Sequence, residues 1–124
     1  MVNPVTHFEV IGEDSKKLQE FYARVFSWKI NADNPVSYGM ISGDGGKGIG
    51  GGIAGSREPQ RRGVTFYIEV ASLEDTLREI EESGGRTVMP PDDVPGGPRM
   101  AQFFDPEGHR IGLVQAGSMR SGPG

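Results

Sequence analysis

Alternating apolar and polar residues predict a strand near the start of the chain, over residues 5–11. Phe8 and Val10 would face a core, while His7 and Glu9 would share the opposite face, because successive side chains of a strand point to opposite sides. The same reasoning predicts three further strands before residue 55, over residues 28–32, 36–42 and 49–54. The last of these strands is rich in glycine.

A helix is predicted between the first two strands, over residues 15–26. Asp14 and Ser15 supply an N-terminal cap for it. Its apolar side chains recur at the spacing of one helix face, and we assign that stripe to the core. The stripe consists of Leu18, Phe21, Tyr22, Val25 and Phe26.

The second half of the chain repeats this order of elements. A strand over residues 64–70 would direct one set of side chains to the core and the other set to the opposite face. The core set is Val64, Phe66, Ile68 and Val70, and the opposite set is Thr65, Tyr67 and Glu69. Ser72 caps a second helix, which Gly84 and Gly85 end. Three more strands are predicted over residues 86–89, 99–104 and 110–115.

Smaller features connect these elements. Residues 43–46 are predicted to form a hairpin turn and residues 105–108 a type I turn, whereas residues 90–98 are predicted to be a loop. On the second helix, Arg78 is spaced to form ion pairs with Glu74 and Glu82.

The two halves also share a short sequence. His7-Phe8-Glu9-Val10 returns as Tyr67-Ile68-Glu69-Val70, and the offset between these copies is two positions longer than the offset between the helix caps Asp14 and Ser72. Both offsets are even, so the facing of the side chains is the same in either register. His7 therefore corresponds to Thr65 or to Tyr67, and the sequence leaves both alternatives open.

This repetition predicts a single domain over residues 1–116, made of two modules. The modules cover residues 5–54 and 64–115, a polar linker covers residues 55–63, and residues 117–124 form a tail. The fold class is α+β, with tandem βαβββ modules forming a curved mixed sheet around a ligand cleft.

Composition and charge exclude several classes of function. The chain of 124 residues has 20 Gly and 9 Pro, placed between patterned segments where turns are expected. Its net charge of −4 gives no basic surface for nucleic acid, and the absence of Cys excludes disulfides and thiolate metal sites. No apolar run is long enough for a membrane helix, and the N-terminus lacks the features of a signal peptide. We therefore expect a cytoplasmic protein.

Several short motifs occur in an order typical of one superfamily. The first strand contains Thr6-His7-Phe8-Glu9, the first helix ends in Val25-Phe26-Ser27-Trp28, and the last hairpin contains Asp105-Pro106-Glu107-Gly108 followed by Ile111-Gly112-Leu113. Over about residues 5–116 the chain resembles the vicinal oxygen chelate superfamily of glyoxalases, bleomycin-resistance proteins and extradiol dioxygenases. This resemblance implies a glyoxalase-like fold with a cleft shared by the two modules.

In metal-dependent members of that family, four side chains from the first and last strands of the modules bind a divalent cation that acts as a Lewis acid. The corresponding positions here are His7, Thr65, Gly112 and a residue near Gly52. His7 is the one effective ligand among them, and a single His does not hold a metal. The resemblance therefore implies that the four-ligand metal site is incomplete, with His7 as its one remaining ligand.

The polar faces of the two first strands still predict a ligand cavity. Its candidate residues are His7, Glu9, Thr65, Tyr67, Glu69 and Gly112. The favoured function is binding of a small molecule without metal, with no cofactor. One alternative is a metal-dependent lyase, isomerase or dioxygenase of the lactoylglutathione lyase type. A second is a metal-independent enzyme that uses Glu9 or Glu69 as its base. The family resemblance also implies a homodimer.

Overall fold

The computed structural model describes residues 2–43 and 47–118 and contains two compact units. We call Thr6–Thr65 the N-terminal unit, and Met1–Val5 together with Phe66–Gly124 the C-terminal unit. Residues 44–46 of the predicted turn and most of the predicted tail fall outside the described residues. Within the described part of the chain, no helix is long and apolar enough to cross a membrane.

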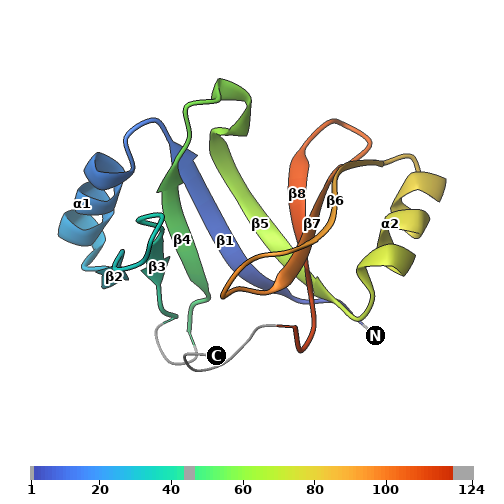
Figure 1. The fold of residues 1–124 in the computed structure, drawn as a ribbon, viewed down its shortest axis with the longest axis horizontal. Coiled ribbons are helices and arrows are strands. Elements are labelled where there is room, and N and C mark those ends of the chain that lie inside the picture. The colour runs from blue at the N-terminus through green and yellow to red at the C-terminus, as the bar shows by residue number, and fades with distance from the viewer. Residues whose placement is uncertain (1, 44–46, 119–124) are drawn as a thin grey trace. The chain divides into compact units, whose positions relative to one another are not determined.

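Each half of the chain has the predicted β-α-β-β-β order (Figure 1). The first half contains β1 (Val5–Gly12), α1 (Ser15–Phe26), β2 (Ile30–Asn31), β3 (Gly39–Ile41) and β4 (Gly50–Gly55). These strands lie in the order β2-β3-β4-β1, with β1 and β4 parallel and the other pairs antiparallel. The segment predicted as a linker contains a 3₁₀ helix, η1 (Pro59–Arg61).

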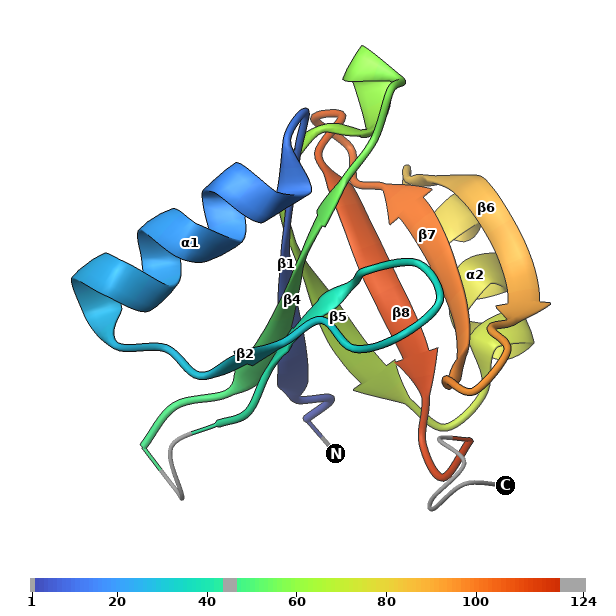
Figure 2. The same cartoon turned by 60° about the vertical axis from the view of Figure 1, so that its left-hand side comes forward.

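The second half contains β5 (Gly63–Val70), α2 (Leu73–Glu82), β6 (Arg86–Asp93), β7 (Arg99–Phe104) and β8 (Arg110–Gln115). Its strand order is β5-β8-β7-β6, again with one parallel pair, β5 and β8. Helix α2 lies against β6, β7 and β8 (Figure 2). The predicted α+β fold with mixed strand pairing is therefore confirmed.

Local side-chain caps explain why both helices begin where the sequence predicts. The Asp14 carboxylate accepts a hydrogen bond from the Lys17 amide at 3.1 Å, and the Ser72 hydroxyl accepts one from the Asp75 amide at 3.1 Å. These bonds satisfy backbone donors that have no partner within the helix. At the other end of α2, Gly84 adopts a positive φ of 100°, which ends the helix.

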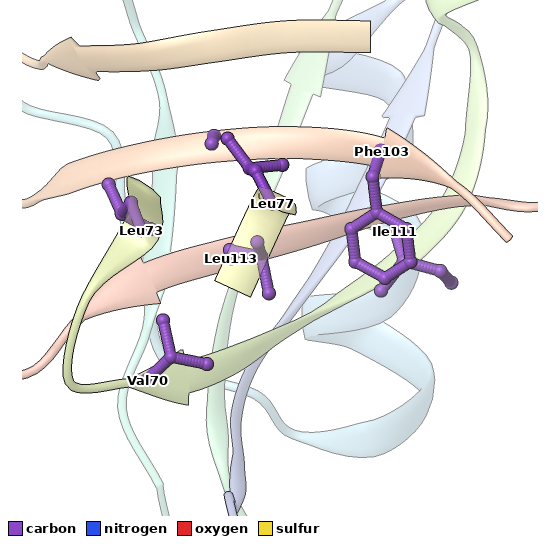
Figure 3. Close-up of a cluster of buried hydrophobic side chains, with 7 residues drawn as sticks. Val70, Leu73, Leu77, Phe103, Ile111 and Leu113 are labelled. Atoms are coloured by element: carbon purple, nitrogen blue, oxygen red, sulfur yellow. The ribbon is translucent and has the colours of Figure 1, made fainter. Parts of the chain in front are cut away.

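The core of the C-terminal unit is a cluster of apolar side chains from α2 and three strands (Figure 3). Its buried members are Val70, Leu73, Leu77, Ala101, Phe103, Ile111 and Leu113, with Ile68 and Ile80 packed against them. The prediction that Ile68 and Val70 face the core is therefore confirmed. It is wrong for Val64 and Phe66, which are 77% and 39% exposed because they precede the part of β5 that meets this cluster.

The N-terminal unit is packed differently. Among its described apolar residues, only Ile41 and Ile53 are buried, and no residue of α1 is. The predicted core stripe of α1 is therefore wrong in part, since Phe21, Val25 and Phe26 are 52%, 53% and 54% exposed. The face of α1 that packs inward instead includes a polar residue, Gln19, whose amide donates to the Ile53 carbonyl at 2.9 Å.

Aromatic rings take the place of an aliphatic core beside α1. The Trp28 ring stacks on Tyr22 with 5.1 Å between ring centroids and 11° between planes, and it contacts Phe8 at 5.5 Å. The Phe8 ring in turn lies over Gly51, where a Cβ atom would overlap it. Trp28 therefore packs as a side chain of this cluster and lies outside β2, which is shorter than predicted.

Strand β3 also begins later than predicted, at Gly39. The Asn34 side chain accepts from the Tyr38 amide at 2.9 Å and donates to the Tyr38 carbonyl at 2.7 Å. Ser37 adopts a left-handed conformation with φ of 56°. Because these bonds use the backbone groups that strand pairing would need, residues 34–38 form a closed loop.

The predicted loop at residues 90–98 is wrong in its first part, because β6 continues to Asp93. The register of β6 against β7 shifts on both sides of Met89. Proline cannot donate a hydrogen bond, and it is tolerated at edge strands and bulges. Strand β6 is at an edge of the strand order given above, so it accommodates Pro90 and Pro91.

The predicted ion pairs of Arg78 with Glu74 and Glu82 are replaced by others. Arg78 instead pairs with Asp75 at 3.2 Å. Glu74 pairs with Arg99 of β7, with 2.5 Å between Oε2 and Nη2. Arg99 also donates to the Gln115 side chain at 3.0 Å, so it links α2 to the ends of β7 and β8.

We expect Leu113→Ala to lower the free energy of unfolding by about 2–5 kcal/mol, because Leu113 is 1% exposed and its removal leaves a cavity. Urea unfolding followed by circular dichroism measures this change. Val36→Ala is the control, since Val36 is 79% exposed, and its effect should stay within about 0.5 kcal/mol. Equal losses in the two variants would contradict the assignment of the core.

The turn between β7 and β8 should make stability depend on acid pH. The His109 amide donates to Asp105, with further bonds from the His109 ring and the Glu107 amide, and these lower the pKa of Asp105 below its ordinary value of 3.8. This contribution to stability is complete above pH 3.8 and is lost as the pH falls through the folded-state pKa.

We therefore expect Asp105→Asn to destabilise the protein at neutral pH, with a difference from wild type that shrinks below about pH 3.8. Thermal unfolding measured from pH 7 to pH 2.5 tests this. Asp92→Asn, the same change at an exposed residue of β6, is the control. Parallel pH curves for wild type and Asp105→Asn would contradict the role given to this carboxylate.

Candidate functional site

The polar face of β1 is opposite the glycine-rich first part of β4. His7 pairs with Gly50 and Glu9 with Gly52, in parallel register. His7 and Glu9 are two residues apart, so they point to the same side of the sheet. Both are partly buried. The structure therefore brings together the first two residues of the predicted cavity.

Tyr38 joins these two side chains. Its hydroxyl donates to Glu9 Oε2 at 2.8 Å and lies 3.0 Å from His7 Nε2. The Tyr38 and His7 rings are nearly parallel, with 15° between their planes. The Tyr38 ring and hydroxyl also cover Gly52, where a Cβ atom would overlap them. Tyr38 thus fills the space that the glycine leaves, and we call His7, Tyr38 and Glu9 the polar triad.

The sequence-based prediction missed Tyr38, because it placed this residue inside a regular strand. Its position depends on the closed loop at residues 34–38, in which Asn34 holds both backbone groups of Tyr38. Gln19 of α1 supports the same loop by donating to the Ser37 carbonyl at 3.2 Å. The available signal was the glycine at position 52, since a glycine inside a strand often marks close approach of another group.

The hydrogen-bond pattern of the polar triad indicates which side chain donates and which accepts in each bond. A hydroxyl has one proton, and the Tyr38 hydroxyl donates it to Glu9. The proton between His7 and Tyr38 therefore belongs to His7 Nε2, which donates to the Tyr38 oxygen. Burial lowers the pKa of His7 from its ordinary value of 6.5, and the Glu9 charge opposes that shift. The lowered pKa favours the uncharged form of the imidazole.

A second tyrosine covers the glycine of the other parallel pair. Tyr67 of β5 pairs with Gly112 of β8, and a Cβ atom at Gly112 would overlap the Tyr67 ring. Tyr67 is 5% exposed, and its hydroxyl accepts a hydrogen bond from Gln102 at 3.2 Å. Gln102 is the second residue of this region that the sequence-based prediction missed.

The other two predicted site residues are also on β5. Thr65 is partly buried and lies two residues before Tyr67. Glu69 is opposite Val114 of β8, and its amide donates to the Pro4 carbonyl at 2.8 Å. The shared cleft between the two halves, with these residues at its surface, stays a prediction.

Strand boundaries decide which residues of the two halves correspond. Both β1 (Val5–Gly12) and β5 (Gly63–Val70) have 8 residues. The offset that aligns their first and last residues is the same as the offset that aligns the helix caps Asp14 and Ser72. His7 therefore corresponds to Thr65 and Glu9 to Tyr67. The longer offset of the repeated tetrapeptide does not mark structurally equivalent positions.

The residues present do not fit the four-ligand metal site that the resemblance implies. Its positions hold His7, Thr65, Gly52 and Gly112, and a tyrosine ring covers each of the two glycines. Within the described ranges, no three His, Asp or Glu side chains form a group that could hold a metal ion. A tyrosine side chain therefore fills the space that a Cβ atom would occupy at Gly52 and at Gly112.

An open hollow of about 690 Å³ lies on the C-terminal unit, away from the predicted site residues. Its lining is Glu81, Gly84, Gly85, Arg86, Phe104, Asp105, Pro106 and Gly108. The charged groups there have structural partners: Glu81 accepts from Thr87, Asp105 accepts from His109, and Arg86 lies over the Phe104 ring. We therefore place the candidate functional site at the polar triad.

Three known proteins show what the chain is similar to. A protein of Mycobacterium bovis named "Putative glyoxylase CFP32" is 28% identical over 110 residues, which cover 83% of this chain. The match spans 42% of that relative's length. A solved structure of hypothetical protein BH1468 from Bacillus halodurans has a TM-score of 0.70 at 18% identity, covering 98% of this chain and 100% of that one.

A methylmalonyl-CoA epimerase of Streptomyces coelicolor, in complex with 2-nitronate-propionyl-CoA, has a TM-score of 0.68 at 18% identity, with coverage of 98% and 100%. At such identity these structures share the fold alone. The family model described as Glyoxalase/Bleomycin resistance protein/Dioxygenase superfamily matches residues 5–113. This match covers most of the chain, from β1 into β8. The chain therefore belongs to the glyoxalase/bleomycin resistance protein/dioxygenase superfamily.

Proposed function

We propose that this protein binds a small organic molecule at the polar triad without the four-ligand metal site of its metal-dependent relatives. One observation carries the proposal: the Tyr38 hydroxyl lies between His7 Nε2 and Glu9 Oε2, and the ring covers Gly52. The triad offers an organic ligand a carboxylate and two ring systems. Polar groups of this kind, placed on a rigid strand, fix the orientation of a small ligand.

Support also comes from how firmly the triad is held. His7 and Glu9 are on one strand, and Asn34 fixes the backbone of Tyr38 on both sides. A site that is already ordered loses little conformational entropy when a ligand binds. The triad therefore has the preorganisation that a binding protein needs, even though the chemical identity of the ligand is open.

The same geometry favours a metal-independent enzyme as the second candidate. Glu9 is the final acceptor of the hydrogen-bonded triad, so it is the carboxylate that we favour over Glu69 as a general base. An enzyme of this type would convert its ligand in the presence of EDTA, whereas a binding protein would return the ligand unchanged. Mass spectrometry of the bound molecule after incubation separates these two functions.

A thermal-shift screen of small metabolites and drugs, performed in EDTA, tests the proposal. A ligand at about 100 times its dissociation constant stabilises the folded state by about 2.7 kcal/mol. We expect such a hit, and we expect Glu9→Gln to weaken its binding about tenfold or more, because a charged hydrogen bond contributes about 1.5–3 kcal/mol. Isothermal titration calorimetry measures the difference.

The control is Glu107→Gln, which makes the same chemical change at an exposed residue of the last turn. This variant should bind the hit as wild type does. Two results would contradict the proposal: hits that require a divalent metal, or hits whose affinity is unchanged in both Glu9→Gln and Tyr38→Phe. A cytoplasmic location is consistent with the proposed role and stays a prediction from the sequence.

We also infer that the protein forms a homodimer through the exposed side of α1. Phe21 and Val25 are one helical turn apart and each is about half exposed. Lys17 and Arg24, also exposed, are on the same side of the helix. Of the five acidic residues of helix α2, Glu74 and Asp75 pair with Arg99 and Arg78. The remaining Glu79, Glu81 and Glu82 give a second copy an acidic surface of complementary charge.

Sedimentation velocity over a range of protein concentrations tests the homodimer. We expect a dimer for wild type and a shift to monomer for Phe21→Glu and Val25→Glu, because a buried unpaired charge opposes association. Val36→Glu, at an exposed loop residue of the same unit, should remain dimeric. A monomeric wild type, or two α1 variants that dimerise normally, would contradict this interface.

A further inference from the structure

The Tyr38 hydroxyl lies where the side chains of His7 and Glu9 converge. It is 3.0 Å from His7 Nε2 and 2.8 Å from Glu9 Oε2, and it stands over the backbone of Gly52. These are hydrogen-bond distances. A metal ion would be bound at about 2.0–2.2 Å from the same nitrogen and oxygen atoms. A hydroxyl and a cation therefore compete for one position between the two side chains.

Two strands and one loop contribute to this point. His7 and Glu9 come from β1, the vacant Cβ direction belongs to Gly52 of β4, and Tyr38 enters from the loop before β3. With the hydroxyl present, the Glu9 carboxylate already has a donor and the His7 Nε2 proton already has an acceptor. Metal binding would require His7 to lose that proton from Nε2 and Glu9 to lose its donor.

We propose that Tyr38 is the residue that determines the ligand class of this site, because its side chain occupies the position from which a third metal ligand would complete the pair formed by His7 and Glu9. This inference rests on the proposed function in that both place the site at the polar triad. It adds that His7 and Glu9 are competent metal ligands, and that a third ligand in place of Tyr38 completes the set.

The C-terminal unit provides a natural comparison. Tyr67 covers Gly112 just as Tyr38 covers Gly52, but its hydroxyl accepts from Gln102, a neutral amide. The residue that corresponds to His7 is Thr65, and the one that corresponds to Glu9 is Tyr67 itself. Removing the Tyr67 phenol therefore uncovers no pair of metal ligands, whereas removing the Tyr38 phenol does.

Tyr38→His is the decisive variant. An imidazole is shorter than a phenol by about 2 Å, which is close to the length of a zinc–nitrogen bond. A cation at the former hydroxyl position would thus meet two imidazoles and one carboxylate, the three protein ligands typical of an open zinc site. The change introduces no atom at Gly52, so it avoids the overlap that a larger residue there would cause.

Titration of full-length protein with Ni²⁺, Zn²⁺ and Co²⁺ tests the inference, with stoichiometry from calorimetry and the visible spectrum of bound Co²⁺. We expect no stoichiometric binding to wild type or Tyr38→Phe, and one equivalent bound to Tyr38→His. Adding His7→Ala to Tyr38→His should abolish this binding. Tyr67→His is the matched control and should bind none.

Thermal unfolding in EDTA first establishes that each variant folds. If Tyr38→His does not fold, Tyr38→Ala combined with Gly52→Glu supplies the third ligand from β4 instead. The inference is wrong if wild type binds a metal ion as tightly as Tyr38→His, or if folded Tyr38→His and the folded double variant both bind none. These readouts use metal ions alone, so they are independent of the organic ligand screen.

Discussion

The run of three glycines at the start of β4 is the constraint on which the N-terminal unit depends. Gly51 and Gly52 are adjacent, so the space above each of them is on opposite faces of the sheet. The Phe8 ring fills one space and the Tyr38 ring the other, and a Cβ atom at either glycine would overlap its ring. On the Phe8 face, the ring continues into the aromatic cluster with Trp28 and Tyr22. On the Tyr38 face, the ring brings a hydroxyl to His7 and Glu9. One run of glycine thus sets both the packing and the chemistry of this unit.

The two units bury apolar side chains in different ways. This difference explains why the apolar side chains of α1 are exposed. The C-terminal unit buries seven apolar side chains in one cluster, the arrangement expected when a helix lays an apolar stripe on a sheet. In the N-terminal unit the glycines provide no apolar surface for α1 to cover. Gln19 therefore bonds to backbone carbonyls of Ile53 and Ser37. Phe21 and Val25, which a conventional interface would bury, remain half exposed.

The sequence predicted those features that depend on neighbouring residues and missed those that depend on distant ones. Helix starts at Asp14 and Ser72 were correct because each cap bonds within three residues. The turn at Asp105 was correct for the same reason. Tyr38 was missed because a loop closed by Asn34 moves it out of the strand pattern. The repeated tetrapeptide suggested a longer offset between the two halves than the helix caps did. Side chains alternate along a strand with a period of two residues, so a shift of two residues leaves their facing unchanged. Only the strand boundaries could therefore decide between the two offsets.

The direction of hydrogen bonding in the polar triad links the packing constraint to ligand chemistry. Because the ring of Tyr38 is fixed over Gly52, its hydroxyl cannot leave Glu9 without uncovering the glycine. The direction of hydrogen-bond donation, from His7 to Tyr38 and from Tyr38 to Glu9, is therefore set by the fold and is present before a ligand binds. An incoming molecule meets a carboxylate whose charge is already partly satisfied by a phenol. Such a carboxylate binds a neutral or weakly polar donor at a lower desolvation cost than a bare one. The glycine at position 52, by admitting the phenol, thus supports the proposed binding of an organic ligand at this site.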